Sequence, residues 1–177
     1  LLGLEFEVRV PETDEAWMPD EAPPVAARRL AERKLAAVSG GPDEIILAAD
    51  TLVALAGEPL GKPRDAPEAI AMLERLAGRR HTVFTGLALA MEGRIESGVR
   101  ETKVWVRPVD RVECAEYVAT GEPLDKAGAY GIQGLGAALV ERIEGEYFNV
   151  MGLPVQLFLE LLGRFRLRYA FGRLEAR

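Results

Sequence analysis

Two long segments with strand character, joined by a two-residue turn, constrain the fold more than any other feature of this chain. The first runs from His81 to Met91 and the second from Arg94 to Val106, with Glu92-Gly93 between them. A two-residue connection that contains glycine is typical of a β-hairpin. We therefore expect two long, adjacent, antiparallel strands, around which the rest of the chain must be arranged.

Helical and strand segments alternate along most of the remaining sequence. Asp65-Ala66-Pro67-Glu68 combines an N-cap acid, a proline in the first turn and a glutamate at the third position, which predicts a helix that continues to Gly78. The other predicted elements are a helix at 25–38, a short buried strand at 45–49, a helix from Asp110 to 120–121, a strand at 139–143 and a helix at 154–162. The length of 177 residues suits one domain with a full core, or two small lobes around a cleft.

Both ends of the chain alternate in polarity. Residues 4–10 alternate apolar and charged side chains and predict a half-buried strand, followed by an acidic, proline-rich loop at 11–24. At the other end, the apolar residues of 165–171 alternate mainly with arginines. This tail is expected to add an edge strand or to pack on a neighbouring molecule.

Composition excludes several classes of function. The net charge of −6 argues against a nucleic-acid polymer as partner, although one small anionic ligand needs only a local cluster of cations. No segment reaches the roughly 18 apolar residues that a membrane span needs, and no signal peptide is visible, so we expect a cytoplasmic protein. The single cysteine, Cys114, excludes an internal disulfide, and the single histidine, His81, excludes a multi-histidine metal site. A metal here would be a hard cation bound by oxygen.

The stretch from Asp125 to Gly134 carries an acid, a cation, a phenol and an amide between three glycines. Glycines let the backbone turn and approach a ligand closely. Lys126 can meet a phosphate as a point charge, and the donor and acceptor of Gln133 can read the edge of a base. A nucleotide-binding loop and a glycine-rich turn with solvated polar groups remain equal alternatives on these residues alone.

Other candidate residues are scattered along the chain. Asp50 follows the buried strand at 45–49, where a carboxylate can hold a divalent cation or accept a proton, but an N-cap or turn aspartate is an equal alternative. Thr51 either binds a ligand or continues a strand. Lys62, in a Gly-Lys-Pro loop, and Lys34, on a charge-rich helix, are phosphate contacts or, more commonly, surface lysines. Asp14-Glu15 could ligate metal or be solvated.

The order of these signals is more specific than any one of them, and it resembles the Maf family of nucleoside triphosphate pyrophosphatases over about residues 1–162. The segments that carry the resemblance are Ala49-Asp50-Thr51, Gly61-Lys62-Pro63-Arg64-Asp65, Leu76-Ala77-Gly78-Arg79-Arg80-His81, Thr85-Gly86, Thr120-Gly121-Glu122-Pro123, Asp125-Lys126-Ala127-Gly128-Ala129-Tyr130-Gly131-Ile132-Gln133-Gly134 and Gly152-Leu153-Pro154.

The resemblance implies an α/β fold, with an elongated mixed β-sheet flanked by helices and two lobes around a cleft, in a single domain covering residues 1–177. It also implies hydrolysis of a nucleoside triphosphate to the monophosphate and pyrophosphate with a divalent metal, Mg or Mn. One branch of the family favours 7-methyl-GTP. Lys126, Tyr130 and Gln133 look like the other branch, which acts on dTTP and UTP.

Roles can be carried over residue by residue. Asp50 matches the proton acceptor of the family, and Asp50 with Glu15 would hold the metal. Thr51 and Gln133 match positions that set substrate specificity. The resemblance places Glu15, Lys34, Lys62 and Lys126 at polar positions of the cleft.

Some expectations stay open. The family begins with a strand and a Ser-x-Ser-Pro-Arg-Arg loop whose arginines face the phosphates, and Leu1-Leu2-Gly3 matches the stretch after that loop, so we expect a natural protein that also contains it. A pyrophosphatase for modified nucleotides such as 7-methyl-GTP and a nucleotide-binding regulator of septum formation are the alternative functions. The family pattern and the alternating tail favour a homodimer.

Overall fold

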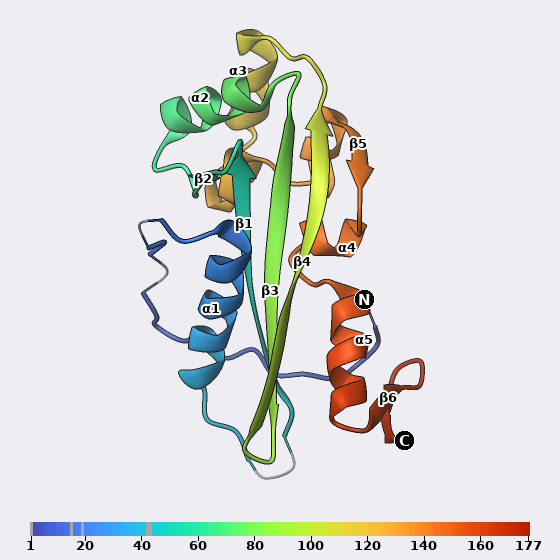
Figure 1. Cartoon of the computed structure of the whole chain (residues 1–177). Helices are drawn as coiled ribbons and strands as arrows, with labels where there is room; N and C mark the ends of the chain where they lie inside the picture. Colours follow the sequence, from blue (N-terminus) through green and yellow to red (C-terminus); the bar gives the residue numbers. More distant parts are fainter. Residues whose placement is uncertain (1, 15, 19, 42–43) are drawn as a thin grey trace.

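The computed structural model describes residues 2–14, 16–18, 20–41 and 44–177. A five-stranded sheet of order β2-β1-β3-β4-β5 runs through the length of the molecule, and helices cover both of its faces (Figure 1). The strands are β1 (Ile46–Leu55), β2 (Glu58–Leu60), β3 (Arg80–Met91), β4 (Arg94–Val106) and β5 (Val140–Glu144). The helices are α1 (Pro23–Ala36), α2 (Ala66–Leu76), α3 (Arg111–Ala119), α4 (Tyr147–Val150) and α5 (Val155–Arg164).

The α/β class and the elongated sheet flanked by helices are confirmed. All four strand pairings of this sheet are antiparallel, so within the described residues no parallel pair makes the sheet mixed. The predicted hairpin forms the two longest strands, and both residues of its turn, Glu92 and Gly93, have positive φ angles of 50° and 76°. The predicted N-cap Asp65 is also present, because its carboxylate accepts a hydrogen bond from the main-chain N–H three residues later, at 2.9 Å. Asp110, where a helix was predicted to begin, accepts the same kind of hydrogen bond at 2.9 Å.

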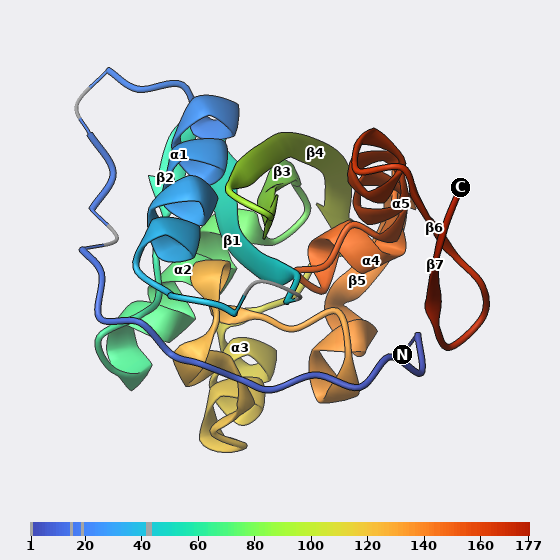
Figure 2. The same cartoon turned by 90° about the horizontal axis from the view of Figure 1, so that it is seen from below.

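Alternation along β1 and β3 sends successive side chains to opposite faces of the sheet. The even-numbered residues, such as Phe84 and Ala88, pack with α1. The odd-numbered residues pack with two separate apolar clusters on the other face. Val83 belongs to the cluster built with α2 and α3, and Leu87 belongs to the cluster built with α5. Figure 2 shows α1 and α5 on opposite sides of the curled sheet.

The buried strand predicted at 45–49 is longer than expected. β1 continues through Asp50 and Thr51, because its pairing with β3 runs unbroken from Ile46 to Ala54. The prediction that Asp50 and Thr51 follow the carboxyl end of a buried strand is therefore wrong, and both residues lie in the middle of an antiparallel strand. On its other side β1 pairs with β2 only from Val53 to Leu55, so among the described residues its edge before Val53 carries no partner strand.

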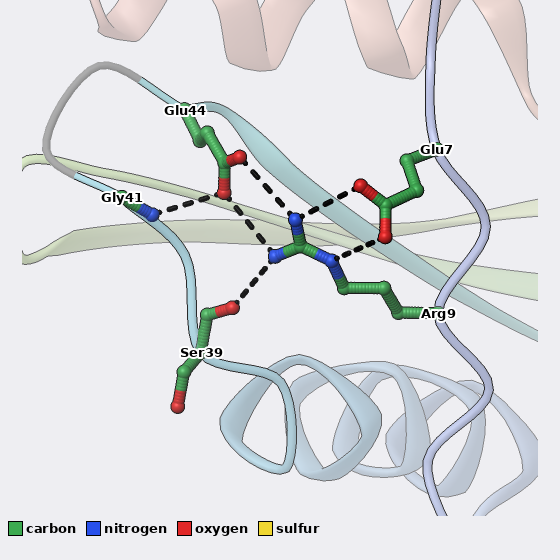
Figure 3. Close-up of polar contacts among 5 residues, drawn as sticks. All are labelled: Glu7, Arg9, Ser39, Gly41 and Glu44. Atoms are coloured by element: carbon green, nitrogen blue, oxygen red, sulfur yellow. Dashed lines mark hydrogen bonds and ion pairs between the residues drawn. The ribbon is translucent and has the colours of Figure 1, made fainter.

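The strand predicted at residues 4–10 does not form, and among the described residues this segment pairs with no strand. Phe6 and Val10 are exposed by 84% and 87%. An ion-pair cluster holds the segment instead: Arg9 lies between the carboxylates of Glu7 and Glu44 and also donates to a main-chain oxygen at 2.8 Å (Figure 3). Apolar alternation alone did not suffice to make a strand here.

The tail beyond α5 does not extend the main sheet. β6 (Leu167–Tyr169) and β7 (Leu174–Ala176) form a separate two-stranded sheet. The Tyr169 hydroxyl donates to the main-chain oxygen of Leu2 at 2.6 Å, so the N-terminal segment contacts the tail beside α5 (Figure 1). Phe171, between the two strands, is 93% exposed.

Candidate active site

A cleft of about 690 Å³ opens at the edge of β1 that has no partner strand in the described part of the chain. It brings together residues from α1, β1, the loop after β2 and the glycine-rich stretch. All six sequence-predicted site residues that the structure describes line it, namely Lys34, Asp50, Thr51, Lys62, Lys126 and Gln133. The remaining predicted residue, Glu15, lies outside the described residues.

The β1 edge divides the cleft between the two faces of the sheet. Asp50 projects on the even-numbered face, which α1 covers. Thr51 projects on the opposite face, together with Val53, against which the glycine-rich stretch packs. A ligand that crosses this edge can therefore contact Asp50 at one end and Thr51 at the other.

Lys34 and Asp50 form the charged pair of the cleft. The Lys34 Nζ donates to Asp50 Oδ1 at 2.5 Å. The aspartate side chain is only 7% exposed and the lysine side chain 21% exposed. Lys34 reaches this carboxylate because α1 lies close to the sheet, where Gly86, the pairing partner of Asp50, faces the backbone of Ala27. A buried carboxylate beside a cation is suited to proton transfer and to cation binding.

Lys62 and Lys126 come from two loops that are tied together, since the Gly128 N–H donates to the Gly61 oxygen at 3.0 Å. Gly128 has a φ of +74°, and a Cβ there would lie 3.1 Å from Val53, so this position favours glycine. Lys126 donates to its neighbour Asp125 at 2.6 Å, and this contact is the largest cause of the lowered pKa of that carboxyl. Lys62 is exposed, whereas Lys126 is half-buried and also donates to the Glu122 main-chain oxygen at 2.8 Å.

The loop that carries Gln133 is held from behind by Glu122, which sequence reasoning did not single out. The Glu122 carboxylate accepts hydrogen bonds from the main-chain N–H groups of Leu135 and Gly136 and from the Tyr117 hydroxyl, each at 2.9 Å. These contacts lower the pKa of the Glu122 carboxyl, with the Gly136 amide the largest cause. Gln133 itself is exposed. The position of Glu122 in a Thr-Gly-Glu-Pro turn gave no local signal for its anchoring role.

A buried polar network reaches the cleft from the interior and was also missed. The Thr51 and Thr85 hydroxyl oxygens are 3.0 Å apart, and Thr85 donates to the main-chain oxygen of Asn149 at 2.8 Å. The Asn149 side chain donates to the Val83 oxygen at 3.1 Å and to the Thr102 hydroxyl at 3.0 Å. Thr85, Thr102 and Asn149 are fully buried. The signal that could have identified Thr85 is its position opposite Thr51 in the strand pairing.

Tyr130, one of the residues that pointed to the substrate branch, is only 5% exposed. Its hydroxyl lies 2.7 Å from His81 Nε2, and burial lowers the pKa of the His81 imidazole from 6.5 to about 4. Burial likewise raises the pKa of the Tyr130 phenol. Tyr130 lines the cleft and His81 is buried behind it, so the histidine has a structural position.

Trp17 also lines the cleft, and its indole N–H donates to the Glu21 oxygen at 2.8 Å. Among the described residues, no group of three or more His, Cys, Asp or Glu side chains is arranged to hold a metal ion. In the same part of the chain, no helix is both long enough and apolar enough to cross a membrane.

Three lysines and a buried carboxylate around one cleft of an α/β fold define a protein class suited to a polyanionic ligand. The particular family follows from comparison with known proteins: residues 1–165 match the family model described as Maf-like protein, and the chain belongs to that family.

Several relatives are similar over most of both chains. A protein of Desulfotalea psychrophila named dTTP/UTP pyrophosphatase is 51% identical over 164 residues, which cover 91% of this chain and 84% of the relative. Proteins with the same name from Symbiobacterium thermophilum and Thermus thermophilus are each 48% identical, covering 93% and 91% of this chain and 85% and 84% of their own lengths.

Proposed function

We propose that this chain is a nucleoside triphosphate pyrophosphatase that hydrolyses dTTP and UTP to the monophosphate and pyrophosphate. One observation carries the proposal: a single cleft places the buried Lys34–Asp50 pair on one side of the β1 edge and Thr51 on the other, with Lys62, Lys126 and Gln133 around it. Relatives at 42–51% identity that bear the name dTTP/UTP pyrophosphatase support the same reaction.

In the proposed mechanism, the triphosphate lies across the β1 edge. Lys34, Lys62 and Lys126 neutralise the phosphates and the charge that develops on the pyrophosphate leaving group. Asp50 accepts the proton of the water that attacks the α-phosphorus. Asp50 already contacts an ammonium group at 2.5 Å, which favours its charged form, the form that a base requires. Gln133 offers a donor and an acceptor to the pyrimidine.

We also propose a divalent cation, Mg or Mn, as cofactor. Magnesium in phosphate-transfer sites takes one or two protein carboxylates together with phosphate oxygens. Asp50 supplies one such carboxylate, and Glu15 is the second candidate ligand from the sequence. Such a cation would screen phosphate charge when bound.

The reaction is tested by measuring pyrophosphate release from a panel of dTTP, UTP, CTP, GTP and 7-methyl-GTP with Mg or Mn. Rapid turnover of dTTP and UTP is expected. Preference for 7-methyl-GTP would favour the modified-nucleotide alternative. Nucleotide binding by calorimetry with no product formed would favour the regulator of septum formation.

The role of Asp50 is tested by Asp50→Asn, which keeps the shape of the side chain but removes the base. We expect kcat, measured at a temperature where the variant is fully folded, to fall by about 10²–10⁴-fold, the usual contribution of general acid–base catalysis. Asp65→Asn is the matched control, because asparagine caps a helix as well as aspartate does, and Asp65 caps α2 away from the reaction. Full activity of Asp50→Asn would refute the assignment.

A cytoplasmic setting and a homodimer complete the proposal. The proposed substrates are cytoplasmic nucleotides, and the exposed Phe171 of the tail offers an apolar contact to a second copy. Sedimentation at several protein concentrations tests the dimer, with a monomer throughout as the contrary result.

A further inference from the structure

The hydroxyl group of Thr51 is the point where the buried polar network meets the cleft. Thr51 lines the cleft, and its Oγ1 is 3.0 Å from the Oγ1 of Thr85. The distance alone allows either hydroxyl to donate. Which of them donates decides whether Thr51 presents a proton or lone pairs to a bound ligand.

The surroundings of Thr85 settle this choice. A threonine hydroxyl has a single proton, and Thr85 Oγ1 lies 2.8 Å from the main-chain oxygen of Asn149, which can only accept. Thr85 is fully buried and has no access to water. Its proton is therefore committed to Asn149, so Thr85 accepts from Thr51. The Thr51 proton therefore points to Thr85, and the Thr51 oxygen keeps its remaining lone pair as an acceptor in a residue that lines the cleft.

The carbonyl that fixes this arrangement is itself held in place. The Asn149 side-chain nitrogen donates to the Val83 oxygen and to the Thr102 hydroxyl, on β3 and β4. The Asn149 carbonyl also accepts from the Gly152 N–H at 3.0 Å. Because these partners are main-chain groups or buried side chains, Asn149 cannot turn its carbonyl away from Thr85.

We propose, on the basis of the proposed function, that Thr85 is a positioning residue that makes Thr51 a fixed hydrogen-bond acceptor and thereby favours uracil and thymine over cytosine. The N3 atom of uracil and thymine carries a proton, whereas the N3 of cytosine carries a lone pair. An acceptor that cannot reverse binds the first and repels the second. The glycine-rich stretch that carries Gln133 packs against Val53, on the same face as Thr51.

Gln133 cannot supply this discrimination alone. Its side chain is exposed, and its amide can turn over to exchange donor and acceptor. Such an amide can pair with the edge of either uracil or cytosine. Thr51 differs because reversing its hydroxyl would require Thr85 to give up the bond to Asn149. The loss of one hydrogen bond of this kind corresponds to a discrimination of about fivefold to tenfold.

The test compares kcat/KM for UTP with kcat/KM for CTP in Thr85→Val, Thr85→Ser and Ser97→Ala. Thr85→Val releases the Thr51 hydroxyl, so the UTP/CTP ratio should fall about fivefold or more. Thr85→Ser keeps the hydroxyl and should restore the ratio to within about twofold of the wild type. Ser97→Ala removes a buried hydroxyl of β4 that lies outside both this network and the cleft lining, so it should leave the ratio unchanged.

An unchanged UTP/CTP ratio in folded Thr85→Val would overturn the proposal. If that variant does not fold, Thr51→Val and Thr51→Ser replace it, since Thr51 is partly exposed. Thr51→Val should lower the UTP/CTP ratio and Thr51→Ser should keep it. An unchanged ratio in Thr51→Val likewise overturns the proposal.

If the wild type hydrolyses no pyrimidine triphosphate, the proposed function fails separately. Calorimetric binding of UMP and CMP then replaces kinetics. UMP must bind more tightly than CMP in the wild type and lose that advantage in Thr85→Val. Equal binding of the two nucleotides by the wild type would overturn the proposal.

Discussion

Gly86→Ala tests whether the close approach of α1 to the sheet positions Lys34 against Asp50. Gly86 pairs with Asp50 across β1 and β3 and faces α1. A Cβ at this position would lie 2.1 Å from the Ala27 oxygen and 2.7 Å from the Arg28 nitrogen. Both atoms belong to the backbone, so no side-chain rotation can relieve the clash. The helix must move away from the sheet.

The magnitude follows from the distances. Real Cβ contacts are essentially never under 3.0 Å, so α1 has to move by about 1 Å. Ala27 and Ala31 are fully buried in that interface, and close-packed interiors resist such displacement. Overpacking of this kind costs about 1–3 kcal/mol, of which the reduced chain entropy of alanine offsets about 0.4–1 kcal/mol. We expect a net loss of about 1.3 kcal/mol, or roughly 3–5 °C in melting temperature for a chain of this length.

The catalytic consequence is separate from the loss of stability. Lys34 lies two turns after Ala27 on the same face of α1, so moving the helix lengthens the 2.5 Å contact between Lys34 and Asp50. We expect kcat to fall at least tenfold at a temperature where the variant is fully folded, because misplacement by about 1 Å is costly for catalysis.

Gly98→Ala is the matched control for this substitution. It also adds a methyl group to a glycine of a central strand, and its Cβ would lie 2.8 Å from Leu157 Cδ1. That atom is the far end of a flexible side chain, so the change should cost less than about 1 kcal/mol and leave kcat intact. Thermal unfolding and steady-state kinetics of both variants decide the matter. If Gly86→Ala melts and turns over like Gly98→Ala, the close approach of α1 does not position the pair.

Three further outcomes are expected. Glu122→Gln places an amide NH₂ against the main-chain N–H groups of Leu135 and Gly136, so we expect a loss of about 1–3 kcal/mol in the free energy of unfolding. The KM for dTTP should rise at nearly constant kcat, and an unchanged KM would count against the anchoring role. The pKa of His81 is about 4 in the folded chain against 6.5 in the unfolded chain, so the unfolded state binds more protons between these values. The free energy of unfolding should therefore fall by about 1.5 kcal/mol as the pH drops from 6.5 to 5. Because His81 is the only histidine, its NMR titration is unambiguous, and a pKa near 6.5 would contradict the burial argument. Removing divalent cations with a chelator should abolish pyrophosphate release and added Mg or Mn should restore it, whereas full activity in excess chelator would exclude the proposed cofactor.

The sequence predicted the parts of the fold that local chemistry decides. The β3–β4 hairpin depends on a two-residue glycine turn, and the starts of α2 and α3 depend on the capping carboxylates of Asp65 and Asp110. These interactions join residues a few positions apart. The N-terminal segment shows the limit of such reasoning, because residues 4–10 have the alternation of a strand but pair with none among the described residues.

The site was predicted through the order of its motifs, and its supports were not. Asp50, Lys62 and Gln133 could be found because each stands in a recognisable short segment. Thr85 and Glu122 also stand in such segments, but their supporting roles could not be predicted, since these depend on the register of β1 with β3 and on a loop that returns to the carboxylate more than ten residues later. Long-range contacts of this kind leave no pattern in a single sequence.

The position of the cleft follows from how the odd-numbered face of the sheet is filled. Val83 belongs to the apolar cluster built with α2 and α3, Leu87 belongs to the cluster built with α5, and Thr85 lies between them on β3. Apolar side chains at positions 51 and 85 would join the two clusters into one core. They would also remove the Thr51 hydroxyl, the hydrogen-bond acceptor that the buried network holds in a fixed orientation at the cleft wall. Burying Thr85 costs little stability because its hydroxyl has partners on both sides, at 3.0 and 2.8 Å. The polar layer that interrupts the core therefore also supplies the oriented hydrogen-bond acceptor that the cleft offers to a base.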